Sequence, residues 1–267
     1  GKILAPDKAF SEYAVEFAPL QPGETDYYQY CTAIPVASLL ACSWDLALLE
    51  DMGDLVGDEM SQYGIRVWLA PGMNIHRDPL CGRNFEYFSE DPLLSGLCAA
   101  ADVRGVQRHP KAGACIKHFF ANNQEDNRMS VNEHIGEQAL REIYLRNFAE
   151  TIAAGDPECL MTSYNLVNGI HTANSYDAIT AFAREESGFS GYVMTDWSTS
   201  SARITAQVSR PDAYYPCASS AECIRAGNDL QMPGTQENID DIVDAVQNGT
   251  LPLGYLQRCA LRILRAL

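Results

Sequence analysis

The chain has 267 residues and a formal net charge of −16, since 35 acidic residues outnumber 19 basic ones. No basic stripe interrupts this acidic excess, so we expect neither nucleic acid nor an anionic membrane surface as a partner. No apolar run reaches the roughly 18 residues that a membrane span needs, whereas a neutral, hydroxyl-rich ligand is compatible with the composition.

Length and cysteine usage narrow the class of protein further. A chain of this length suits one α/β barrel, a class in which about 250 residues is typical. None of the nine cysteines is closer than six residues to the next, which predicts neither a disulfide framework nor a metal knuckle. We therefore expect reduced, buried thiols and a cytoplasmic location, with secretion as the alternative.

The predicted elements alternate along the chain. Residues 1–31 have no sustained period and carry several prolines, so they should form an irregular lead-in. From Trp44, apolar residues recur at helical spacing as far as Met60, with Ser43 or Asp45 as the cap. Beyond this helix we expect strands over 65–69, 114–120, 159–164, 191–196 and 229–232, and helices over 92–108, 132–154, 176–187, 219–226, 237–247 and 254–266.

This alternation predicts βαβ units and a parallel sheet. The pattern predicts about five strands, fewer than the eight of a closed barrel. The expected fold is therefore α/β, a (β/α)8 TIM-like barrel that is incomplete or modified at its first strands.

The segment Gly191–Trp197 is an apolar run that ends in a carboxylate followed by an indole. The carboxyl ends of parallel strands open onto the reaction face of a barrel, which would present Asp196 there. Aspartate can act as a covalent nucleophile toward an anomeric carbon, and the flat face of Trp197 suits a pyranose ring. The alternative is that Asp196 merely caps the next helix.

Polar residues also follow the other predicted strands. They are Asn74 to Asp78, Lys117 and His118, and Ser163 to Asn165. Lys117 is one of four lysines, and its charge suits donation to a sugar hydroxyl, with His118 as a second donor. A Schiff-base lysine with a depressed pKa is the rival interpretation of Lys117.

The loop from Asp78 to Pro92 contains the longest specific motif. The planar fork of Arg83 can bind two adjacent hydroxyls, and Glu86 can hold that fork in place. Ser89 or Asp91 with Pro92 makes a cap for the following helix. Farther along, Arg128 is expected to brace a carboxylate or a loop rather than to touch substrate.

A metal is not expected, because no pair of histidines has the spacing of a metal site.

Five ordered motifs together resemble the catalytic barrel domain of glycoside hydrolase family 3, in its two-domain β-glucosidase branch. The match runs from about Thr32 to the C-terminus, so we expect a lead-in over 1–31 and the catalytic domain over 32–267. The motifs are Gly82-Arg83-Asn84-Phe85-Glu86-x-x-Ser89-Glu90-Asp91-Pro92, Lys117-His118-Phe119, Arg141-Glu142-Ile143-Tyr144-Leu145, Met161-Thr-Ser-Tyr164-Asn165-x-x-Asn168-Gly169 and Val193-Met-Thr-Asp196-Trp197.

The resemblance implies a role for each matching position. Asp196 would be the nucleophile of a retaining hydrolysis of terminal β-linked glucosyl or related residues, a reaction that needs no cofactor. Trp197 would line the rim toward the aglycone, and Met161 would lie near the floor of the sugar site. The residues that fix the sugar in the first subsite would be Arg83, Lys117, His118 and Tyr164.

Two departures from the family pattern matter. The family places an aspartate of an upstream Asp-Gly motif on the outer sugar hydroxyls, and nothing before Asp26 has that context. In this branch the acid/base glutamate belongs to a second domain, which these residues do not include. We therefore expect a fragment of a longer enzyme, whose second domain or partner chain supplies the acid, and a homo-oligomer is possible.

Another branch, the single-domain N-acetylglucosaminidases, supplies the acid from a histidine on a loop after Lys-His-Phe. Here Phe119 is followed by Phe120-Ala-Asn-Asn, so that mechanism is not supported. The alternative from another class of function is a non-catalytic carbohydrate-binding barrel that retains the sugar pocket.

Overall fold

The structure is a computed structural model that describes residues 2–3, 27–28 and 31–267. The chain divides into two units, Gly1–Ile34 and Pro35–Leu267. In the first unit, β1 (Lys2–Ile3) pairs antiparallel with β2 (Tyr27–Tyr28). The rest of the predicted lead-in over 1–31, apart from Cys31, lies outside the described residues. The parallel sheet, its helices and the candidate site belong to the second unit.

A parallel sheet forms the centre of the second unit. Its strand order is β3-β4-β6-β9, with β3 at Val67–Trp68, β4 at Gly113–Phe119, β6 at Cys159–Thr162 and β9 at Tyr192–Met194. A single bridge from Met194 to Leu230 continues the sheet in the parallel sense, at the fifth strand predicted from sequence. Because all these strands run the same way, their carboxyl ends share one edge.

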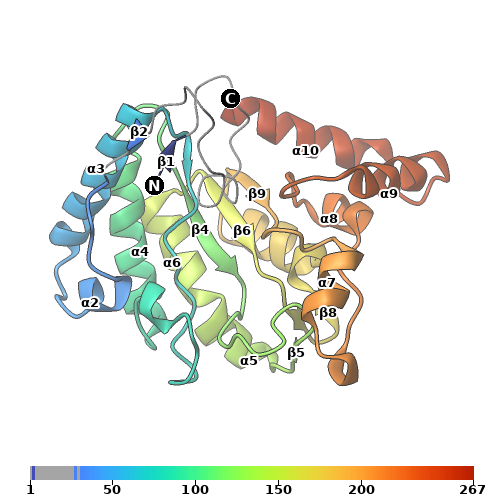
Figure 1. The fold of residues 1–267 in the computed structure, drawn as a ribbon, viewed down its shortest axis with the longest axis horizontal. Helices are drawn as coiled ribbons and strands as arrows, with labels where there is room; N and C mark the ends of the chain where they lie inside the picture. The colour runs from blue at the N-terminus through green and yellow to red at the C-terminus, as the bar shows by residue number, and fades with distance from the viewer. Residues whose placement is uncertain (1, 4–26, 29–30) are drawn as a thin grey trace, which may run out of the picture. The chain divides into compact units, whose positions relative to one another are not determined.

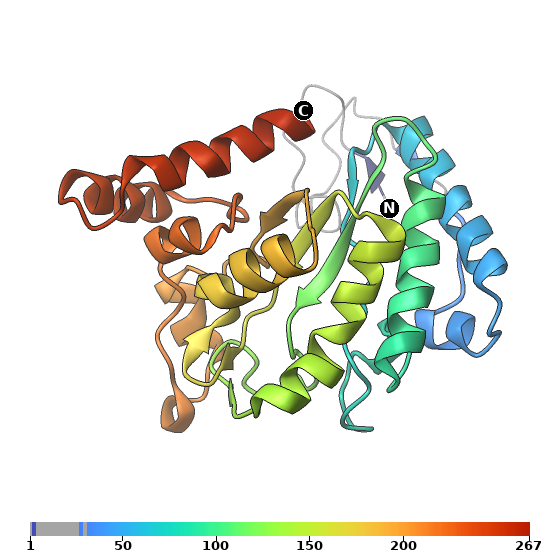
Figure 2. The ribbon, with the colours of Figure 1, turned by 180° about the vertical axis from the view of Figure 1, so that it is seen from behind.

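Helices cover one face of this sheet, as Figure 2 shows. They are α4 (Pro92–Val106), α6 (Arg146–Gly155) and the π-helix η4 (Asp177–Glu186). Alternate strand residues such as Ile116, Leu160 and Val193 are fully buried. The other alternate residues form an apolar cluster of Cys115, Cys159, Met161, Tyr192 and Met194, against which Ile263 and Ala266 pack. Both faces of the strands are therefore buried, which explains their continuous apolar runs.

Further helices flank this core (Figure 1). α2 (Ala37–Ala41) precedes α3 (Leu46–Tyr63), which packs along α4. The carboxyl-terminal part contains α7 (Ala202–Val208), η5 (Pro211–Ala213), α8 (Ser220–Ala226), α9 (Gln236–Gln247) and α10 (Leu253–Ala266). Asp45 caps α3, since its carboxylate accepts from the N–H groups of Ala47 and Leu48. Asp91 caps α4, with Pro92 at its first position.

The predicted helix over 132–154 is wrong in its first turns. Asn132–Glu133 forms β5, and the helical segment begins with α5 (Glu137–Ala139) and the π-helix η2 (Leu140–Tyr144) before α6. β5 pairs with β7 (Leu166–Val167), which forms a hairpin with β8 (Ile170–His171) through Asn168 and Gly169. Both turn residues have positive φ, at 50° and 88°, which an Asn-Gly pair tolerates. The short helix η3 (Thr172–Asn174) follows.

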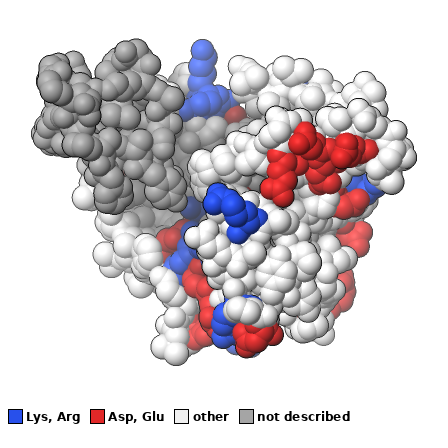
Figure 3. All heavy atoms as spheres, turned by 45° about the vertical axis from the view of Figure 1, so that its right-hand side comes forward, with Lys and Arg blue, Asp and Glu red and all other residues white. Residues whose placement is uncertain are grey.

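The distribution of surface charge and the burial of the cysteines can be compared with the expectations from the sequence. The space-filling view in Figure 3 shows a continuous acidic patch and no basic stripe across that face. Six cysteines are buried, as expected, whereas Cys31 and Cys42 are exposed. Among the described residues, none of the helices combines the length and the apolar character that crossing a membrane requires.

Candidate active site

Asp196 lies two residues beyond the end of β9, with only 6% of its surface exposed. Its carboxylate accepts a hydrogen bond of 2.7 Å from the backbone N–H of Trp197 and another from the hydroxyl of Tyr164. The alternative that Asp196 caps the next helix is wrong, because Ser201 caps α7.

Burial is the largest influence on Asp196 and raises the pKa of its carboxyl above the usual value. The two hydrogen bonds and the positive charges of Arg83 and Arg128 act in the opposite direction without cancelling it. The carboxyl is therefore both buried and close to two cations, and burial has the larger effect on its pKa.

Lys117 and His118 reach the same cluster although they are neighbours on β4. The β4–β6 register shifts between Ile116 and Phe119, so an irregularity breaks the usual alternation of side chains. The ammonium of Lys117 lies 3.5 Å from Glu86, and Nε2 of His118 lies 3.8 Å from Asp196.

His118 is almost fully buried, and its imidazole is neutral. Burial and the charges of Arg83, Lys117 and Arg128 lower the pKa of His118 well below its usual range. Nη2 of Arg83 donates to Nε2 over 3.0 Å, so the ring proton belongs on Nδ1, which faces Oδ1 of Asn74 at 3.3 Å. Asn74 also bonds both backbone groups of His118, which fixes the ring in place.

Arg83 and Glu86 form a bidentate pair at the short helix η1 (Asn84–Glu86), with hydrogen bonds of 2.9 and 2.8 Å. Burial alone would raise the pKa of Glu86, but the bonds from Arg83 and the charge of Lys117 lower it below its usual value. Glu86 is thus a shared counter-ion for Arg83 and Lys117. A paired lysine of this kind does not match the desolvated amine that Schiff-base chemistry needs.

Arg128 and Tyr164 come together because the small β5-β7-β8 sheet joins their loops. The guanidinium of Arg128 lies 4.9 Å from the centre of the Tyr164 ring, and its Nη1 donates to Glu125 over 3.0 Å. Burial and the charge of Asp196 raise the pKa of Tyr164, so its hydroxyl stays a proton donor.

The remaining predicted residues lie at the edge or beneath this cluster. Trp197 is 45% exposed, which leaves much of its indole open to a ligand. Met161 is buried in the apolar cluster inside the sheet. Arg77 donates to Tyr144, and Asp78 accepts from the N–H of Leu80, so these two strand-end residues have structural partners.

Three further residues of the cluster were not identified from sequence: Tyr87, Asn122 and Glu125. Asn122 donates to the hydroxyl of Tyr87 and to Glu125, and the same hydroxyl lies 3.3 Å from Nδ1 of His118. The polar residues 122–128, which follow β4, were the signal available in the sequence. That signal does not indicate which of their side chains turn inward.

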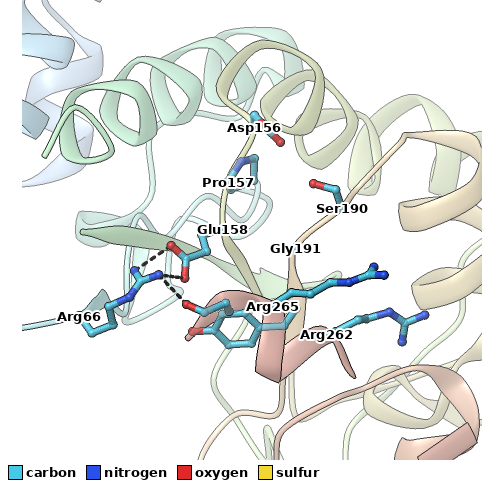
Figure 4. A pocket seen from close by; sticks show the side chains of 10 residues that line it. Arg66, Asp156, Pro157, Glu158, Ser190, Gly191, Arg262 and Arg265 are labelled. Carbon is cyan, nitrogen blue, oxygen red and sulfur yellow. Dashed lines mark hydrogen bonds and ion pairs between the residues drawn. The ribbon is translucent and has the colours of Figure 1, made fainter. Parts of the chain in front are cut away.

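A separate cavity of about 340 Å³ lies at the amino ends of the strands, next to Glu158 and Gly191 (Figure 4). There Arg66 pairs with Glu158 and Arg262 with Asp229. This end of a parallel barrel serves stability rather than chemistry, so Asp196 marks the candidate site. Within the described part of the chain, no cluster of three or more His, Cys, Asp or Glu side chains could hold a metal ion.

Comparison with known proteins gives the family of the chain. The family model described as the glycosyl hydrolase family 3 N terminal domain matches residues 20–266. The chain belongs to this family. The thermostable β-glucosidase B of Acetivibrio thermocellus is 40% identical over 238 residues, which are 88% of this chain and 29% of that protein. An exo-α-(1->6)-L-arabinopyranosidase of Bifidobacterium breve is 38% identical over 89% of the chain and 29% of its own length.

Solved structures agree with this assignment. β-Glucosidase 3B of Thermotoga neapolitana, solved in complex with α-D-glucose, aligns with a TM-score of 0.82 at 42% identity. The alignment covers 93% of this chain and 33% of that protein. The expected α/β, TIM-like barrel is thereby confirmed. The chain spans a third or less of the length of these relatives.

Proposed function

We propose that this chain supplies the nucleophile and the first sugar subsite of a retaining β-glucosidase. The single observation that carries the proposal is the buried Asp196 carboxylate, fixed by Trp197 and Tyr164 and facing His118. A carboxylate held this rigidly in a dry site can attack an anomeric carbon and stabilise the positive charge that develops there.

The proposed substrate is a terminal, non-reducing β-linked glucosyl or related residue. Arg83 and Lys117 would donate hydrogen bonds to its hydroxyls, and the neutral His118 would contact it through the ring edge that faces Asp196. Tyr164 would stay hydrogen-bonded to Asp196. Trp197 would stack on the aglycone side, and Met161 would support the floor. Glu86 orients two of the donors and Arg128 braces Tyr164.

The proposed reaction needs two carboxyl groups. Asp196 attacks C1 and forms a glycosyl-enzyme ester, while a protonated acid gives its proton to the leaving oxygen. Water then cleaves the ester after giving its proton to the same group. No cofactor takes part, and we propose that a glutamate of a second domain or partner chain acts as this acid and base.

Covalent trapping tests the role of Asp196. We expect a dinitrophenyl 2-deoxy-2-fluoro-β-glucoside to label Asp196 in the full-length polypeptide that contains this chain, as peptide mass spectrometry would detect. Asp196→Asn should lose labelling and lower kcat on the order of 10⁴-fold. Asp78→Asn is the matched control, because the amide oxygen of the new side chain could still accept the turn hydrogen bond from Leu80.

The second candidate is a non-catalytic sugar-binding barrel, which the half-exposed Trp197 beside a donor-rich cluster also suits. Glucose that protects the protein from thermal unfolding, with no adduct on Asp196, would favour this alternative over hydrolysis.

A further inference from the structure

Glu125 lies where two halves of the sugar site meet. Its Oε2 accepts from Arg128 over 3.0 Å, and its Oε1 accepts from Asn122 over 2.9 Å. The same Oε1 lies 4.0 Å from Nε of Arg83, which belongs to the loop after β3. A single carboxylate thus faces two arginines from different loops, with 21% of its side chain exposed.

We propose that Glu125 is a positioning residue, which holds Arg128 over the ring of Tyr164 and thereby sets the electrostatic field at Asp196. The inference rests on the proposed function, since it concerns the same site.

The first step of the argument is the path from Glu125 to Asp196. Glu125 is the carboxylate within ion-pair distance of Arg128 among the described residues. Arg128 in turn packs on Tyr164, whose hydroxyl bonds to Asp196. The charge of Arg128 also lowers the pKa of Asp196, against the effect of burial. A shift of Arg128 would therefore change both a hydrogen bond and a charge at the nucleophile.

The second step is the path from Glu125 to the side chains that are proposed to bind the sugar. Asn122, which is 3% exposed, links Glu125 to the hydroxyl of Tyr87, and that hydroxyl lies 3.3 Å from His118. The carboxylate thus has partners on both sides of the cluster. Partners of this kind, which hold the groups that bind substrate, commonly decide how well a site is organised.

The third step is charge balance. Two cations, Arg83 and Arg128, act on Asp196. Glu86 is already the ion-pair partner of Arg83, and it also lies 3.5 Å from the ammonium of Lys117. Without Glu125 the guanidinium of Arg128 would have no nearby counter-ion among the described residues except the nucleophile itself. A partly buried cation in that state is expected to turn toward solvent.

Two substitutions separate charge from position. In Glu125→Gln the amide oxygen can still accept from Arg128, so Arg128 stays while a negative charge disappears, and the pKa of Asp196 should fall. Glu125→Ala removes the same negative charge but also releases Arg128. Because the charge of Arg128, unlike that of Glu125, is among the main influences on Asp196, the loss of the cation should outweigh the loss of the carboxylate, and the pKa of Asp196 should rise. The acidic limb of the kcat/KM profile should therefore move to lower pH in the first variant and to higher pH in the second.

The experiment measures kcat, KM and their pH dependence for an aryl β-glucoside, in the full-length polypeptide. We expect kcat/KM to fall about 10-fold to 100-fold in Glu125→Ala, since small displacements in a site have effects of this size. Glu125→Gln should recover most of that loss. Asp126→Ala is the matched control, because Asp126 lies on the same loop but pairs with Arg210, and it should leave the profile unchanged.

The possible failures are distinguishable. A wild-type polypeptide without glycosidase activity would overturn the proposed function and this inference with it. An active wild type in which Glu125→Ala behaves like Asp126→Ala would overturn the inference alone. If Glu125→Ala does not fold, Glu125→Ser takes its place, because its short side chain also lacks the acceptor that holds Arg128: an acidic limb displaced to higher pH supports the inference, and a wild-type profile overturns it.

Discussion

Asp196 combines two environments that push its proton affinity in opposite directions. Burial raises the pKa of the carboxyl, while two hydrogen bonds and two arginines lower it. The proposed nucleophile is thus desolvated enough to be reactive, yet it retains donors that stabilise its charged form. The hydroxyl of Tyr164 is the donor that can be removed with the least change in shape.

We expect Tyr164→Phe to move the acidic limb of the kcat/KM profile to higher pH. The hydrogen bond from Tyr164 lowers the pKa of Asp196, so its loss raises that pKa and delays ionisation as pH rises. The limb in kcat/KM reports the free enzyme, in which this bond is present. An unchanged limb would show that Tyr164 does not act on the carboxylate, and Tyr176→Phe, at a half-exposed side chain, is the control.

Residue identity alone did not reveal the partners in this site. Lys117 and His118 were identified because they end an apolar run, whereas Glu86 was expected to pair with Arg83. Glu86 also forms an ion pair with Lys117, because the irregularity in β4 turns two consecutive side chains to one side. Nothing in the local spacing encodes such an irregularity.

At the scale of elements, α3 and α4 approach so closely that glycine is required at the crossing. A Cβ atom on Gly105 would overlap the backbone oxygen of Glu50, and one on Gly53 would overlap that of Asp102. These contacts hold α4 against the sheet, and α4 begins directly after the loop that carries Arg83 and Glu86.

We therefore expect Gly105→Ala to destabilise the chain by about 1 to 3 kcal/mol or more, because the two backbones cannot separate without disturbing the helix layer. Urea unfolding followed by circular dichroism would measure the change. Gly254→Ala in α10 is the matched control, since a Cβ there meets open space and alanine favours the helix. Equal midpoints for both variants would contradict the close crossing.

Helices and strands were predictable where a regular pattern of apolar residues extended over enough of the chain. The helices α3, α4, α9 and α10 and every strand of the parallel sheet were expected within a few residues of their bounds. α7 was not expected from the sequence, because its seven residues are too few for a clear period. Asn132 and Glu133 looked helical, but pairing with β7 makes them a strand, so tertiary contacts override local preference there.

At the scale of the whole molecule, the proposed chemistry needs a carboxyl group that is not identified among these residues. We expect residues 1–267 produced alone to hydrolyse activated aryl β-glucosides slowly and cellobiose hardly at all. An aryl leaving group needs little help from an acid, whereas a sugar alkoxide needs its proton. Release of nitrophenol and of glucose would measure the two rates, and rapid turnover of cellobiose by the isolated chain would contradict a separate acid.

The amino-acid sequence by itself determined the family, the α/β class and the polar residues at the strand ends, because motifs and hydrophobic periods are local properties of the chain. Only the tertiary structure decided which of those residues meet. Arg77 and Asp78 find structural partners, while Glu125, which is far from Arg83 in the sequence, completes the cluster around Asp196. The physical reason is that burial and charge pairing depend on side chains from separate loops, whose approach is set by the sheet and not by their spacing in the sequence.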